Sequence, residues 1–402
     1  MKMKTLFLIL SLNLLVHSSF GQYLDIYSMV MPVPKENKLV DPGYYVWCGS
    51  VTKADDGKYY MMYSRWPLAD GFESWPVTSE VAVAVSDHPG GPFKHVKVAL
   101  KARGTTFWDG SATHNPAVVK HRGKYYLYYM GTSCDLPIKK HESYTDTWWR
   151  YRNTQRIGVA VANHPTGDWT RLDQPVLSVG TDSTAPDALM VSNPAATFDD
   201  QGRVILLYKQ VGKTDKINGG AVRFGVAFSD SPFGPFQKHD KPIFEVNDGG
   251  KDWMVAEDPF VWFQHGQYLA IVRDVIGKFS GDEGAWALMV SQNGTDWQPA
   301  KHPKVIGSTF FLGRWNPIRF QTRASLSPLG KWGAYFPLRC HPGGQSANPF
   351  LQCCGAPKAS KLTYAFVSQL YKLFKNESPY TSIFHFTTYL SFFSGKSQRT
   401  KT

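Results

Sequence analysis

The chain has little of what small secreted proteins and metalloproteins use to hold a fold together. Its 402 residues contain five cysteines, an odd and sparse set that predicts no disulfide framework. Neither a C-x-x-C pair nor a His and Cys cluster at zinc spacing occurs, so no metal or other cofactor is predicted. No apolar run after residue 22 reaches the length of about 20 residues that a membrane-spanning helix needs. Packing of the chain itself must therefore supply its stability.

Residues 1–21 have the composition of a secretory signal peptide. Lysines near the start precede an apolar stretch of about ten residues, and the small residues Ser19 and Gly21 follow. A membrane anchor is the alternative, but the apolar stretch is short for a span. The sequence predicts cleavage after Gly21 and a mature protein that is secreted or periplasmic.

Net positive charge is scarce outside the C-terminal part. The net charge of +12 would fit a partner such as nucleic acid or an anionic surface. However, residues 313–402 hold 12 Lys and Arg and one acidic residue, which leaves residues 1–312 with a net charge of +1. The basic character belongs to the C-terminal part, and no nucleic-acid partner is predicted.

One phrase returns four times, as CGSVTKADDGKYYMMY (48–63), NPAVVKHRGKYYLYY (115–129), NPAATFDDQGRVILLY (193–208) and DPFVWFQHGQYLAIV (258–272). Each phrase predicts a β-hairpin with a polar turn, and each is followed by a third strand and a turn with an aromatic residue. The turns end in Gly57, Gly123, Gly202 and Gly266. The return of one strand–turn–strand phrase along the chain predicts the four-stranded blades of an all-β propeller. A β-sandwich also has short strands, but it would not repeat one phrase four times.

A fifth repeat is due near residue 330, and it is missing. If the codons from Arg314 onward are read one base out of step, they permit the phrase ERPFL…ENG at the expected spacing. We therefore expect a five-bladed propeller whose catalytic domain spans residues 22–312, with the fifth blade corrupted by a frameshift near Leu312. Residues 313–402 then form an anomalous basic tail; a genuine basic module is the alternative.

Polar residues precede or begin the first strand of each predicted blade. First strands line the central channel of a propeller, so these residues are expected at one mouth: Asp41, His114, Asn115, Asp187, Asn193, Glu257 and Asp258. Hydrolysis of a glycosidic bond needs a protonated carboxylic acid and an ionised carboxylate, and a charged neighbour separates their pKa values. Asp41, Asp187 and Glu257, which we expect at matching positions of their repeats, are the candidate catalytic acids. Turn or cap bonds are the alternative for Asp41 and Asp187.

The order of these acids resembles that of the five-bladed propeller glycoside hydrolases of families 43 and 117. The resemblance covers residues 22–312. It implies an inverting mechanism in which Asp41 is the general base and Glu257 is the general acid. Asp187 would orient the general acid and tune its pKa. The related fructoside-cleaving propellers would instead make the first Asp a nucleophile. Family 117 uses a His as acid, which leaves a role open for His114 and Asp258, and family 43 leaves open a channel ion such as Ca²⁺ near His114.

Aromatic and basic residues near the predicted mouth favour a sugar ligand. Ring faces stack on the CH groups of sugars, and guanidinium groups bind carboxylate or sulfate. The substrate-binding candidates among them are Trp47, Arg65, Trp66 and Arg156, together with His114, Asn115, Asn193 and Asp258. The expected partner is an oligosaccharide or polysaccharide, and an anionic one is left open.

Taken together, the sequence predicts a secreted, exo-acting glycosidase for plant or algal polysaccharide. A sugar-binding propeller without catalysis is the main alternative. A phosphorolytic enzyme would need a cluster of basic side chains at the channel, and the sequence contains no such run.

Restoring one base near the Leu312 codon is expected to yield a soluble, cooperatively folding protein, whereas the 402-residue chain itself should be poorly soluble. The physical reason is that an absent fifth blade exposes apolar faces of blades one and four. Resequencing the gene and comparing the solubility of the two proteins checks this. A soluble, active enzyme from the confirmed 402-residue reading frame would contradict it.

Overall fold

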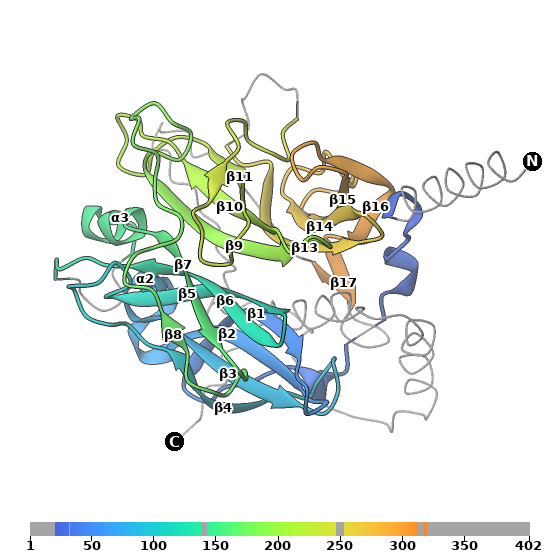
Figure 1. Cartoon of the computed structure of the whole chain (residues 1–402), viewed down its shortest axis with the longest axis horizontal. Helices are drawn as coiled ribbons and strands as arrows, with labels where there is room; N and C mark the ends of the chain where they lie inside the picture. Colours follow the sequence, from blue (N-terminus) through green and yellow to red (C-terminus); the bar gives the residue numbers. More distant parts are fainter. Residues whose placement is uncertain (1–20, 32, 138–142, 247–252, 312–316, 320–402) are drawn as a thin grey trace, which may run out of the picture.

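The computed structural model of the chain describes residues 21–31, 33–137, 143–246, 253–311 and 317–319. Four antiparallel four-stranded sheets, which are the blades of a propeller, make up most of the described chain (Figure 1). Within each blade the strands pair in sequence order, and the first strands β1, β5, β9 and β13 lie next to one another. The predicted all-β propeller is confirmed, with four of its blades described.

The strand bounds follow the predicted repeat. They are β1 (Tyr44–Lys53), β2 (Tyr59–Pro67), β3 (Glu80–Ser86) and β4 (Lys94–Leu100) in blade 1; β5 (Ala112–His121), β6 (Lys124–Thr132), β7 (Arg156–Ala162) and β8 (Thr170–Arg171) in blade 2; β9 (Met190–Phe198), β10 (Val204–Val211), β11 (Val222–Ser229) and β12 (Gln237–Lys238) in blade 3; and β13 (Ala256–Gln264), β14 (Gln267–Asp274), β15 (Ala285–Ser291) and β16 (Gln298–Ile306) in blade 4.

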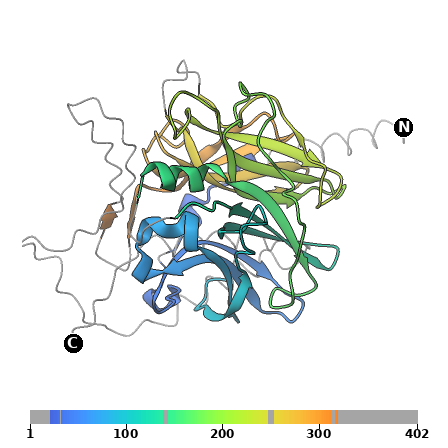
Figure 2. The same cartoon turned by 90° about the vertical axis from the view of Figure 1, so that its left-hand side faces the viewer.

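Helical segments of the described chain are short and lie before the first strand or in connections between strands. The helix α2 (Trp75–Thr78) connects β2 to β3, and α3 (Asp146–Asn153) connects β6 to β7. The side chain of Thr145 caps α3 by accepting a hydrogen bond from the backbone N–H of Trp148. Both helices lie at one end of the propeller, the end that faces the viewer in Figure 2. Five 3-10 helices complete the helical segments of the described chain: Gly21–Tyr23, Tyr27–Met29, Lys35–Asn37, Leu68–Asp70 and Phe72–Ser74.

The predicted hairpin turns are present. Their glycines have φ values of 84°, 75°, 83° and 74° at Gly57, Gly123, Gly202 and Gly266. In this left-handed conformation, a residue that has a Cβ atom is destabilised by steric clashes that glycine avoids. The repeated Gly of the sequence phrase therefore marks a backbone requirement of every blade.

Each first strand also contains a β-bulge at one register position. The pairing with the second strand shifts between Trp47 and Ser50 in blade 1, and matching shifts occur in the other three blades. The second residue of each bulge has a positive φ, and these residues are Cys48, Asn115, Asn193 and Asp258, with φ between 46° and 51°. Bulges re-aim side chains, so the four blades present the same pair of positions to the centre.

Apolar side chains fill the spaces between successive blades. One cluster lies between blades 1 and 2, another between blades 2 and 3, and a third between blades 3 and 4. The N-terminal segment contacts parts of the two remaining faces, since Ile26 packs against blade 4 and Leu39 packs against blade 1. A fifth blade would stand between these two faces, so the segment from residue 21 to 41 joins the ends of the four-bladed array.

The fifth blade itself is not described. The strand β17 (Thr309–Phe311) pairs with β18 (Pro317–Arg319), and the predicted frameshifted tail beyond residue 319 lies outside the described residues. The same holds for residues 1–20 of the predicted signal peptide. Among the residues that are described, no helix is long and apolar enough to cross a membrane.

Gly158→Ala is expected to lower the melting temperature by several degrees. A Cβ at residue 158 would lie 2.3 Å from Cζ2 of Trp108, which packs on the backbone of β6 and β7. Such overpacking costs about 1–3 kcal/mol. Thermal unfolding measures the loss, with Gly90→Ala as control because its Cβ would meet only one atom, at 3.9 Å. Equal melting temperatures for the two variants would contradict this packing.

Candidate active site

Four bulge residues form the inner ring of the propeller, which we define as Cys48, Asn115, Asn193 and Asp258. The Sγ of Cys48 donates to Oδ1 of Asn115 at 2.7 Å, which joins blades 1 and 2. The Nδ2 of Asn193 donates to Oδ1 of Asp258 at 2.5 Å, which joins blades 3 and 4. The structure thus places Asn115, Asn193 and Asp258 at the same position of their blades and joins Asn193 to Asp258 directly. Cys48 was missed, although it begins the first copy of the repeated phrase.

The residue before each ring member also has an equivalent in every blade: Trp47, His114, Ser192 and Glu257. Glu257 lies between two cations, since Lys209 Nζ is 2.9 Å from Oε1 and Arg273 Nη1 is 3.0 Å from Oε2. Burial alone would raise the pKa of Glu257, but Lys209 and Arg273 outweigh it and hold the pKa below its ordinary value. Glu257 is therefore a carboxylate at neutral pH.

Asp258 has the opposite electrostatic environment. Burial, and then the negative charge of Glu257, raise the pKa of Asp258 to about 6, although Lys209, Asn193 and Arg273 act in the other direction. Two interacting carboxyl groups titrate as a pair. Between the two pKa values this pair holds one proton and one negative charge, and the environments place the proton on Asp258.

His114, which stands in blade 2 where Glu257 stands in blade 4, is buried and neutral. The residue is 4% exposed, and its Nδ1 lies 2.7 Å from the hydroxyl oxygen of Ser79. Burial, and then the charge of Lys209, lower the pKa of His114 to about 3. The rings of Trp66 and Trp75 lie 5.5 and 5.1 Å from the imidazole. His114 can accept or donate a hydrogen bond here, but it holds no acidic proton at neutral pH.

Asp41 and Asp187 lie in a second repeated arrangement, which we call the interblade triads. Each triad combines an aspartate before the first strand, a tyrosine of the second strand opposite the bulge, and a base of the fourth strand. The triads are Asp41–Tyr63–His95, Asp109–Tyr129–Arg171 and Asp187–Tyr208–Lys238. Register confirms the equivalence, because His95, Arg171 and Lys238 pair with Ala84, Ala160 and Ala227.

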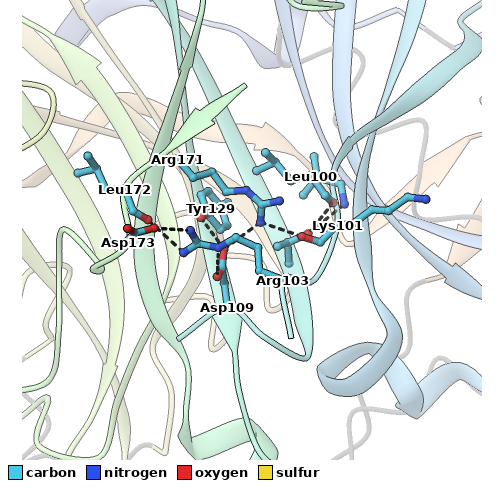
Figure 3. Close-up of polar contacts among 10 residues, drawn as sticks. Leu100, Lys101, Arg103, Asp109, Tyr129, Arg171, Leu172 and Asp173 are labelled. Atoms are coloured by element: carbon cyan, nitrogen blue, oxygen red, sulfur yellow. Dashed lines mark hydrogen bonds and ion pairs between the residues drawn. The ribbon is translucent and has the colours of Figure 1, made fainter. Parts of the chain in front are cut away.

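The triad of blade 2 shows how such an aspartate is held (Figure 3). The Oδ2 of Asp109 accepts from Tyr129 Oη at 2.8 Å and from Arg171 Nη1 at 2.9 Å. The Nε of Arg103 donates to Oδ1 at 2.7 Å. Asp109 is fully buried, so each of its oxygens is used within the protein. This triad fixes the connection that enters blade 2 against the blade itself.

This arrangement corrects one prediction. Asp41, Asp187 and Glu257 were expected at matching repeat positions, but Asp41 and Asp187 match Asp109, whereas Glu257 matches His114. Asp41 and Asp187 are 7% and 3% exposed, and Arg65 Nη1 and Lys238 Nζ respectively pair with their carboxylates. The sequence held a signal for this, because Asp109 precedes the bulge of blade 2 by the same interval as Asp187 precedes that of blade 3.

The predicted aromatic and basic contacts divide between packing and the surface. Arg65 binds Asp41 and Glu80, and Trp66 is 1% exposed with its Nε1 bonded to the carbonyl of Phe72, so both are part of the packed blade. Trp47 is half-buried and meets the Phe72 ring edge-on at 5.6 Å. Arg156 lines a cleft of about 940 Å³ near blades 2 and 3.

The sequence analysis did not identify Lys209 and Arg273, the two cations that lower the pKa of Glu257. Lys209 and Arg273 stand at the same register position of β10 and β14, opposite Ser192 and Glu257. A comparison of the second strands could have found them, because both are charged residues within apolar runs. No group of three or more His, Cys, Asp or Glu side chains in the described part of the chain is placed to hold a metal ion.

Comparisons with known proteins agree with the fold. No protein-family model matches the chain, and no curated protein matches it either. Among solved structures, BT0996 in complex with RGII is 16% identical and has a TM-score of 0.52, over 70% of this chain and 81% of its own.

Two further structures come from the families named above. Zg3597, a family 117 glycoside hydrolase of the marine bacterium Zobellia galactanivorans, is 20% identical over 65% of this chain and 70% of its own, with a TM-score of 0.47. A thermostable family-43 glycoside hydrolase is 15% identical over 67% of this chain and 76% of its own, with a TM-score of 0.45. The likeness to BT0996, and to a structure described as a glycoside hydrolase with the same identity and TM-score, shows that the chain shares the propeller fold of these proteins, with four blades described.

Proposed function

We propose that the protein is a glycoside hydrolase whose reacting carboxyl groups are Glu257 and Asp258. One observation carries the proposal: two adjacent carboxyl groups at the bulge of blade 4 have opposite environments. Lys209 and Arg273 hold Glu257 as a carboxylate, whereas Asp258 meets the amide of Asn193. Pairs of titratable groups whose surroundings separate their pKa values are typical of acid and base assignments in enzymes.

The chemistry follows from the two protonation states. Below its pKa of about 6, Asp258 holds a proton, which it gives to the glycosidic oxygen as the bond breaks. Glu257 keeps its charge, which disfavours ionisation of Asp258 before the reaction. The same carboxylate is available to a water molecule or to the sugar carbon. The family resemblance instead implied that Glu257 is the general acid and Asp41 the general base.

Asp41 and Asp187 enter the proposal as positioning residues. Both are held in interblade triads of the same kind as Asp109, and each is more than nine-tenths buried. Fixing the connection into blade 3 fixes β9, which carries Asn193 of the inner ring. The triads thereby hold the ring amides, and through them Asp258, in one geometry.

A carbohydrate substrate fits the surroundings of the pair. The half-buried Trp75 ring lies 5.1 Å from that of His114, and the buried Trp148 meets it edge-on at 5.9 Å, which holds the Trp75 ring next to a polar group. Sugars bind aromatic rings through their CH groups. The RGII complex of BT0996 and the resemblance of the sequence to families 43 and 117 support a plant or algal polysaccharide as substrate. We also propose that the enzyme is secreted, acts at chain ends and inverts the anomeric configuration. The predicted signal peptide supports the first point, and the family resemblance supports inversion.

Glu257→Gln and Asp258→Asn are each expected to lower turnover at least ~100-fold, the scale of losing acid or base catalysis. The substitutions are nearly isosteric, so folding should be kept. By contrast, Asp41→Asn and Asp187→Asn should lose stability with turnover reduced less than ~10-fold, because they only loosen a triad. Release of reducing sugar from plant and algal polysaccharides and thermal unfolding measure the two effects.

Asp109→Asn is the matched control, since it alters a triad that no prediction linked to catalysis. If Asp41→Asn abolished turnover at an unchanged melting temperature while Asp109→Asn stayed active, Asp41 would be the general base instead. Proton NMR of the first product reports the anomeric configuration, and a retained one would move the mechanism toward the fructosidase type. Sugar binding without turnover in the unmodified protein would contradict the proposal and indicate a binding propeller.

A further inference from the structure

A cleft of about 940 Å³ lies at the end of the propeller where α3 is located. The connections β6–β7 and β10–β11 supply most of its lining, so it lies over blades 2 and 3. Trp108 and Leu189, which stand just before β5 and β9, also line it. The cleft therefore adjoins the segments that lead into the inner ring.

Basic side chains dominate the charge of this cleft. Its lining contains Arg150, Arg156, Lys213 and Lys216, against one acidic residue, Asp135. Within the described part of the chain, no ion pair involves Arg150, Arg156 or Lys213. Three cations on one concave surface, with no described carboxylate at ion-pair distance, create a positive potential that favours an anion.

Hydrogen bonds hold the two walls of the cleft together. Arg152 Nη1 donates to the carbonyl of Asn218 at 3.2 Å, and Asn153 Nδ2 donates to the carbonyl of Ile217 at 2.7 Å. These bonds join the end of α3 to the β10–β11 connection. Arg156 Nη1 donates to the carbonyls of Asn153 and Gln155, which sets the direction of its guanidinium. The basic groups therefore stand on a fixed surface.

A buried donor in the cleft lining also lacks an acceptor. Trp108 Nε1 is buried and has no hydrogen-bond partner among the described residues. A buried N–H without a partner costs free energy, so such groups are often completed by water or a ligand. The indole stacks on Tyr129 with centroids 5.4 Å apart, and its six-membered ring packs on Gly131 and Gly158, which fixes its position.

We infer that this cleft binds an anionic substituent, a sulfate ester or a carboxylate, on the carbohydrate chain that the protein acts on. Arg150, Arg156 and Lys213 supply the positive charge, and the indole of Trp108 supplies a surface for the sugar. Guanidinium groups bind the oxygens of such anions through paired hydrogen bonds. This inference rests on the proposed function, because it names the substrate class of the same enzyme: an acidic polysaccharide, not a neutral one.

The test measures binding of the full chain to three oligosaccharides of one length by affinity electrophoresis: a sulfated galactan fragment, its desulfated form, and an oligogalacturonate. We expect at least one anionic ligand to bind at least ~10-fold more tightly than the neutral one. In the Arg150→Gln/Lys213→Gln variant, that preference should fall to less than ~3-fold. The physical reason is that the variant loses two of the three cations that we expect to pair with the anionic group of the ligand.

Lys124→Gln is the control, because Lys124 is exposed and lies at the hairpin turn of blade 2, far along the sheet from the cleft. It removes a positive charge without touching the lining and should keep the preference. Equal binding of the neutral and anionic ligands, or a preference that Arg150→Gln/Lys213→Gln does not change, would overturn the inference. Because binding is measured without turnover, an anion preference in a protein without hydrolysis would refute the proposed function alone.

Discussion

The β-bulge in the first strand of each blade is the constraint on which the site depends. A bulge places one extra residue against its partner strand, and here it forces a left-handed backbone at Cys48, Asn115, Asn193 and Asp258. Asn and Asp tolerate that conformation better than most residues, which accounts for three of the four. Because the four blades repeat the same bulge, side chains far apart in sequence meet at the centre. The inner ring is a consequence of backbone geometry repeated four times.

The chemistry arises where the fourth blade departs from the others. Blades 1 to 3 carry a tyrosine opposite the bulge and a triad aspartate, whereas blade 4 has Val272 at the tyrosine position. In blade 4 the carboxyl groups stand in the bulge itself, at Glu257 and Asp258. Lys209 reaches Glu257 from blade 3, and Arg273 reaches it from the neighbouring strand. Among the described residues, Glu257 pairs with two cations and Asp258 with none, and this difference separates the pKa values of two carboxyl groups that would otherwise be similar.

The fold was predictable from sequence because the repeat is strong and local. Each hairpin turn needs a left-handed Gly, and alternating apolar strands surround it, so the pattern predicted both the hairpins and their number. The ring residues Asn115, Asn193 and Asp258 followed from their common place in the phrase. The exact register did not, because a bulge shifts it without a change in composition. That is why Asp41 and Glu257 were expected to be equivalent, although one belongs to a triad and the other to the bulge.

Contacts between residues far apart in the sequence were not predictable from it for a similar reason. Lys209 and Glu257 are 48 residues apart, and Arg171 and Asp109 are 62 apart, so no local pattern joins them. The direction of each pKa shift depends on these pairs and on burial, both of which need the assembled propeller. The charge of the basic cleft is another example, because its cations come from two separate connections.

The measurement that tests this account most directly is a ¹³C NMR titration of the labelled side-chain carboxyl groups, with the Asp258 signal assigned by its loss in Asp258→Asn. We expect Asp258 to titrate with an apparent pKa of about 6 and Glu257 below its ordinary value. Replacing Glu257 by Gln should lower the pKa of Asp258, because it removes the negative charge beside it. An Asp258 signal that titrates near the ordinary aspartate value of about 3.9 would contradict the separation of the pair on which the proposed chemistry depends.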